Sequence, residues 1–125
     1  MKIKEYFENT NGLGVLATAD SEGKVDAAVY ARPHVMEDGT IAFIMRDRLT
    51  HHNLQSNPNA TFLFKEEGPG YKGIRLFLTM VREEKNTELL ESLRKRQYIE
   101  EKDESRFLVF FKLDRYLPLI GSGDK

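Results

Sequence analysis

Short apolar segments of strand length, separated by tight glycine-containing turns, limit what this chain can fold into. The turns DSEG (20–23) and EDGT (37–40) join neighbouring segments directly, and strands joined by so short a turn pair antiparallel. The expected strands span residues 13–19, 24–35, 41–45, 60–66, 74–84 and 106–114. Six strands within 125 residues predict one domain, residues 1–125, that is mainly β with a few helices. A small antiparallel barrel, closed or split, would leave few strand edges exposed.

Helices are expected between some of these strands. Thr50 suits the N-cap of the middle one, Leu49 and Leu54 have the spacing of a hydrophobic staple, and Pro58 prevents continuation. In the second strand, Pro33 must lie at an end, an edge or a bulge. The expected helices span residues 2–8, about two turns from Thr50, and residues 86–98.

The last expected strand is apolar on both faces. Phe107, Val109 and Phe111 alternate on one face, and Leu108 and Phe110 on the other. A small barrel needs only one apolar face, so the second must pack against a helix or a second subunit. We expect a homodimer.

Composition excludes several classes of function. The net charge of −1, from 19 basic and 20 acidic residues, favours neither nucleic acid nor an acidic membrane as a partner. The sequence contains no cysteine, no signal-like apolar run at its start and no segment long enough to span a membrane. A cytoplasmic protein is the expectation. The basic run RKRQ (94–97) lies among glutamates and is expected to be a solvated helix face.

No catalytic or metal-binding constellation stands out. HExxH, GxSxG, GxGxxG and Walker patterns are all absent. His51 and His52 are adjacent, so on a helix they point about 100° apart and do not chelate one metal. We therefore predict no catalytic side chain and no metal. In the glycine-rich turn GPGYKG (68–73), Tyr71 and Lys72 either shape the turn or cover a ligand.

A cationic cluster precedes the middle helix. Arg46 and Arg48 supply charge-assisted donors, Thr50 adds a hydroxyl, and the first N–H groups of a helix attract an anion. Arg32, near the end of the second strand, could reach the same point. These residue types alone leave two readings open, a phosphate site or solvated arginines beside a capping threonine.

The run GVLATADSEGKVDAAVYARPHVMEDGTIAFIMRDRLTHHNLQSNPNATFLF (14–64), with the order of the expected elements, resembles the pyridoxamine 5′-phosphate oxidase-like FMN-binding split barrels. GPGYKGIRL (68–76) is similar to the small bacterial FMN-binding proteins of that superfamily. The resemblance implies a six-stranded antiparallel split barrel that forms a homodimer with FMN sites at the interface. The chain ends without the arginine- and histidine-containing substrate segment of the true oxidases, so vitamin B6 oxidation is not expected.

The resemblance also implies roles for residues of this sequence. The second strand would lie along the flavin ring, and the end of the third strand with the helix start would bind the ribityl chain and phosphate. Leu49 stands where many members have lysine, so either Arg46 or Arg48 would take over the phosphate, or the phosphate would be bound more weakly. The implied cofactor-binding residues are Val29, Tyr30, Ala31, Arg32, Met45, Arg46, Arg48, Leu49 and Thr50.

Three functions fit these features. The first is an FMN-dependent oxidoreductase that passes electrons or hydride between a reductant and a small acceptor, with the chemistry supplied by the cofactor. The second is a non-enzymatic FMN-binding electron-transfer protein. The third is a haem-binding split barrel, in which His34, His51 or His52 would be the axial ligand.

Overall fold

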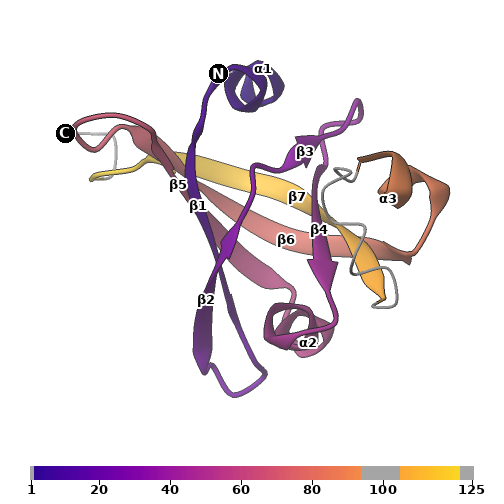
Figure 1. The fold of residues 1–125 in the computed structure, drawn as a ribbon. Helices are drawn as coiled ribbons and strands as arrows, with labels where there is room; N and C mark the ends of the chain where they lie inside the picture. Colours follow the sequence, from indigo (N-terminus) through magenta and orange to yellow (C-terminus); the bar gives the residue numbers. More distant parts are fainter. Residues whose placement is uncertain (1, 94–104, 122–125) are drawn as a thin grey trace.

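A single antiparallel sheet forms the body of the protein in the computed structural model, which describes residues 2–93 and 105–121 (Figure 1). Its strands lie in the order β2-β1-β5-β6-β7-β4-β3. The strands are β1 (Gly12–Ala19), β2 (Val25–Tyr30), β3 (His34–Val35), β4 (Ile41–Arg46), β5 (Asn59–Glu66), β6 (Gly73–Lys85) and β7 (Arg106–Pro118). The helices are α1 (Ile3–Asn9), α2 (Leu49–Ser56) and α3 (Glu88–Leu93). The predicted mainly β, antiparallel split-barrel fold is confirmed.

The structure has seven strands where the sequence predicted six. The segment 24–35 was expected to be one strand, but it divides into β2 and β3 with residues 31–33 unpaired between them. Pro33 lies in this break, because it has no N–H to give to a ladder and fixes its own φ. The break lets β2 pair with β1 and β3 pair with β4, at opposite edges of the sheet.

The sheet curls around an aromatic core. Alternate residues of β1, β5 and β6 point inward, and the Phe62 ring lies 5.0 Å from Phe43 and 6.1 Å from Phe7 between ring centroids. Close packing of this kind requires Gly14, because a Cβ there would lie 2.4 Å from Cζ of Phe62. Side chains from α1, β1, β4, β5, β6 and β7 thus share one apolar interior.

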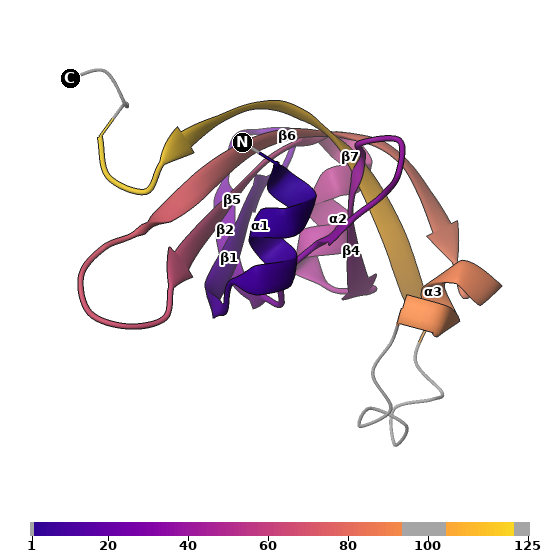
Figure 2. The ribbon, with the colours of Figure 1, turned by 90° about the horizontal axis from the view of Figure 1, so that it is seen from above.

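The barrel is split because its two edge strands do not pair. Register shifts in the β6–β7 ladder mark irregularities in its two longest strands, and bulges of this kind bend a sheet. The curvature brings β2 and the β3–β4 pair to face one another, with α1 at one end of the gap and α2 at the other (Figures 1 and 2).

Helix α3 covers the second apolar face of β7. Leu108 and Phe110 pack with Leu90 of α3 and Ala42 of β4, apart from the main core. The helix alternative stated for this face is therefore the one found in the structure, and the face gives no separate support to a dimer. Residues 94–98 of the expected helix, including RKRQ, lie outside the described residues.

Candidate functional site

A cleft of about 1160 Å³ lies between the two unpaired sheet edges. Its walls come from α1, β2, the 31–37 segment, β4 and the start of α2, with Leu93 and Arg106 at the margin. All nine residues that the sequence nominated for cofactor binding line this one cleft. Tyr71 and Lys72 do not line it, so the turn that carries them serves the β5–β6 connection.

Tyr30 joins the two sides of the cleft. Its ring meets the Phe43 ring of β4 edge-on at 6.0 Å, and its phenol hydrogen-bonds the Thr50 hydroxyl of α2. Burial raises the pKa of Tyr30, so the phenol stays protonated at neutral pH. Val29, the residue before Tyr30 on β2, also lines the cleft and is 71 % exposed, and Ala31 follows Tyr30 as the first residue of the unpaired segment.

Arg32 lines the cleft but also holds α1. One amino group, Nη1, donates to the carbonyl oxygens of Phe7 and Thr10, at 2.9 Å each. These carbonyls lie at the C-terminal end of α1, where helix oxygens lack intrahelical partners and a cation is favoured. The expectation that Arg32 reaches the helix start at α2 finds no support in this geometry, because the guanidinium binds at the α1 end.

The start of α2 differs from the sequence expectation. The helix begins at Leu49 with Arg48 as its N-cap, since the N–H of His52 already bonds the carbonyl of Arg48 at 2.9 Å. The prediction of Thr50 as N-cap is therefore wrong by two residues, and its hydroxyl bonds Tyr30 instead. The hydrophobic staple is also wrong, because Leu49 lies inside the helix and is largely exposed.

This correction changes the character of the helix end. Arg48 makes no side-chain cap hydrogen bond, since arginine carries no oxygen that could accept one. The first N–H groups of α2 therefore open toward the cleft without a capping side chain from Arg48, and an anion is favoured there. Met45 lies just before them and is buried in the core.

Sequence reasoning missed Arg106. This residue begins β7, pairs across the ladder with Arg46, lines the cleft and is only 5 % exposed. Its backbone is fixed by two hydrogen bonds of 3.0 Å with Asn86. Three arginines thus line the cleft, of which Arg46 and Arg106 are partners across the ladder and Arg48 is the N-cap of α2. Arg106 could have been predicted only from the pairing of residues 41–46 with residues 106–111. These segments are far apart in the sequence, so local patterns do not reveal their pairing.

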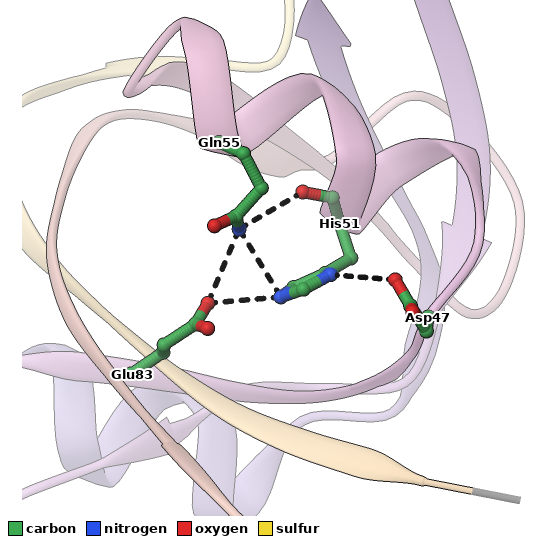
Figure 3. Close-up of polar contacts among 4 residues, drawn as sticks. All are labelled: Asp47, His51, Gln55 and Glu83. Carbon is green, nitrogen blue, oxygen red and sulfur yellow. Dashed lines mark hydrogen bonds and ion pairs between the residues drawn. The ribbon is translucent and has the colours of Figure 1, made fainter.

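The three histidines have different surroundings. His34 of β3 lines the cleft, whereas His52 is exposed on α2 and does not line it. His51 is buried outside the cleft, with its two ring nitrogens bound to Asp47 and Glu83 (Figure 3). Of the three haem-ligand candidates, only His34 therefore faces the cleft.

Residues 2–93 and 105–121 contain neither a metal-binding cluster nor a membrane-spanning helix. No group of three or more acidic or histidine side chains in this part is arranged to hold a metal ion. No helix in the same residues has the length and apolarity needed to cross a bilayer.

Comparison with known proteins shows which family and which solved structures this chain resembles. A family model described as pyridoxamine 5′-phosphate oxidase matches residues 2–115, and no curated protein matches the chain in sequence. An FMN-binding protein from Syntrophomonas wolfei subsp. wolfei has a similar structure, with a TM-score of 0.73, 22% identity, and 96% of this chain and 85% of that chain covered.

Two further structures share the fold, and their names refer to ligands other than FMN. An F420 reductase aligns with a TM-score of 0.68 and 12% identity over 90% of this chain and 94% of that one. A heme binding protein from Mycobacterium smegmatis aligns with a TM-score of 0.65 and 18% identity over 99% of this chain and 55% of that one. Such identities establish the shared fold, and the family match over residues 2–115 establishes membership. The chain belongs to the pyridoxamine 5′-phosphate oxidase-like family of FMN-binding split barrels.

Proposed function

We propose that the protein is an FMN-binding oxidoreductase whose cleft between β2 and β4 holds the flavin. The observation that carries the proposal is that Arg46, Arg48 and Arg106 line the same cleft as the first residues of α2, whose N-cap makes no side-chain cap hydrogen bond. Guanidinium groups and helix N–H groups are the donors that a phosphate monoester takes. The volume of the cleft, about 1160 Å³, is slightly larger than the roughly 300–1,000 Å³ of most ligand pockets.

The remaining walls suit the flavin ring. Val29, Tyr30 and Ala31 would lie along its face, with the Tyr30 phenol and the backbone of the unpaired edge available for its polar rim. FMN, when bound, supplies the transfer of hydride or single electrons. The chain's own residues bind and orient the ring and limit the access of water. We assign no side chain as a general acid or base.

We further propose a homodimer in which a second copy covers the outer face of β2, β1 and β5. Val29, Val15 and Leu63 are aligned across these strands by register, and Val25 beside them is 82 % exposed. Val29 belongs both to this apolar face and to the cleft, so a partner seated here would complete the cleft wall. Sedimentation equilibrium at micromolar concentration should give twice 14.5 kDa, and a monomer alone would refute the dimer.

The absorbance spectrum of the purified protein, followed by titration with FMN, tests the cofactor. We expect flavin bands in the purified protein or tight FMN binding by the apoprotein. A Soret band lost in His34→Ala would instead indicate haem, the alternative favoured by the position of His34 in the cleft. Turnover with NAD(P)H and an acceptor would separate an enzyme from an electron-transfer protein.

A further inference from the structure

His51 is a buried titratable residue to which the proposed function gives no role. It lies outside the cleft, stacked on Phe107 of β7 with ring centroids 3.8 Å apart. Its Nδ1 is 3.0 Å from Asp47 Oδ1, and its Nε2 is 2.9 Å from Glu83 Oε1 of β6 (Figure 3). One ring therefore connects three separate parts of the chain around α2.

Asp47 lies between the two arginines nominated for the phosphate. Its side chain is 65% exposed, so the bond to His51 is a main fixed point of the 46–48 segment. The segment is also held by backbone contacts: the Arg48 N–H donates to the Arg46 carbonyl at 2.9 Å, the His52 N–H donates to the Arg48 carbonyl at 2.9 Å, and Arg46 pairs with Arg106 in the sheet. At the far side, Gln55 donates to Glu83 at 3.2 Å and to the backbone carbonyl of His51 at 3.1 Å, which holds Glu83 toward the ring.

The protonation state of the ring decides how many of these bonds exist. Protonated imidazole has two N–H groups and can donate to Asp47 and Glu83 together. Neutral imidazole with its proton on Nδ1 still donates to Asp47, and its Nε2 can accept from the Gln55 amide, whose Nε2 lies 3.1 Å away. The charged groups around the ring are Asp47, Glu83 and, over the Phe107 face, Lys85 with Nζ 5.8 Å from the centroid. Arg106 adjoins Phe107 in β7.

We infer that His51 is a positioning residue for the anion-binding segment. Through the contact between its Nδ1 and Asp47, it holds the segment that carries Arg46 and Arg48 just before α2. This inference rests on the proposed phosphate site. Its signature is therefore a change in the preference for FMN over riboflavin, which has the same ring system without the phosphate.

Two substitutions of Asp47 separate positioning from simple charge. Asp47→Asn keeps an oxygen that accepts from the ring, whereas Asp47→Ala does not, and both remove the same negative charge from beside the phosphate. Positioning predicts that the Ala variant binds FMN about three- to tenfold more weakly than the Asn variant, with equal riboflavin affinities. Equal FMN affinities would contradict it. Because Asp47 is exposed, we expect both variants to fold.

The second arm changes the ring itself. His51→Phe keeps the stack on Phe107 and should weaken FMN about tenfold without changing riboflavin, while the exposed neighbour provides a matched control in His52→Phe.

Three results are distinguishable. Wild-type preference for FMN that is reduced in His51→Phe, and weaker in Asp47→Ala than in Asp47→Asn, supports the positioning role. Full preference for FMN in His51→Phe, together with equal FMN affinities of the two Asp47 variants, overturns that role and leaves the phosphate site standing. A wild type that binds both flavins equally well overturns the proposed phosphate site, and this inference with it.

Discussion

The fully paired strands β1, β5 and β6 form one wall of the barrel, and their residues have a different role from those of the unpaired edge strands β2 and β3. In β1, β5 and β6, every strand has a partner on both sides, and the inward side chains fill one aromatic core. At β2 and β3 the ladder stops, and the gap between them gathers arginines, a tyrosine and a histidine around a cleft. Pairing satisfies the backbone and leaves side chains to pack, whereas an unpaired edge leaves groups available to a ligand.

The comparison assigns stability to the wall and binding to the edges. Substitutions in the wall should therefore lower the free energy of unfolding by several kcal/mol, and those at the edges should change ligand affinity with little loss of stability. Each of the following variants tests that separation, beginning with the largest expected loss of stability.

Phe62→Ala should cost the most. This ring is fully buried against Phe43 and Phe7, and its removal leaves a cavity that the surrounding strands cannot close. The expected loss in the free energy of unfolding is about 3–5 kcal/mol, measured by urea denaturation. Val81→Ala, at an exposed position of β6, provides the control and should change stability by no more than about 0.5 kcal/mol.

Leu90→Ala tests whether α3 seals the second face of β7. Leu90 is fully buried against Leu108 and Phe110, and its truncation should cost about 2–5 kcal/mol. Leu89→Ala is the matched control on the same helix, since Leu89 is 40% exposed. Equal effects would show that the helix does not cover β7.

Tyr30→Phe tests the one link that joins the two edges. Loss of the bond to Thr50 should cost about 0.5–1.5 kcal/mol at neutral pH. Burial raises the folded-state pKa of Tyr30 above 10.0. The stability that comes from burying the neutral phenol is therefore fully present below pH 10.0 and is lost as the pH rises through the folded-state pKa, whereas the Thr50 bond acts in the opposite direction because it lowers that pKa. Unfolding curves above that pH should show a smaller alkaline loss in the variant, and identical losses would contradict the assignment.

Val29→Ala should have the smallest effect on stability. The side chain is largely exposed on an edge strand, so the change should stay within about 0.5 kcal/mol. Thermal unfolding without FMN measures the effect on stability. The rise in melting temperature when FMN is added measures the effect on binding, because a ligand that binds only the folded state raises the melting temperature. A loss as large as that of Leu90→Ala would mean that the edge also carries the fold.

Two features of the fold could be predicted from local sequence patterns. The hairpin of β1 and β2 was predictable because apolar alternation flanks a four-residue turn, and α2 ends where Pro58 required. The break between β2 and β3 was not placed, since Pro33 allows an end, an edge or a bulge and only the sheet order decides among them.

The site was predictable only as far as its residues are close in sequence. Arg46, Arg48 and Thr50 lie in one short segment, whereas Arg106 and Glu83 come from strands that only the folded sheet brings near. The error over Thr50 arose because residue preference, which favours threonine at an N-cap, was outweighed by the hydrogen bond that Thr50 makes to Tyr30 across the cleft.

The central claim is that the unpaired edges form a flavin site with the phosphate at the start of α2. Calorimetric titration of FMN and riboflavin into the wild type and the Arg46→Ala/Arg48→Ala double variant tests it most directly. Each charge-assisted bond contributes roughly 1.5–3 kcal/mol, so the variant should bind FMN at least about ten- to a hundredfold more weakly and riboflavin almost unchanged. Wild-type affinity of the variant for both flavins would contradict the claim.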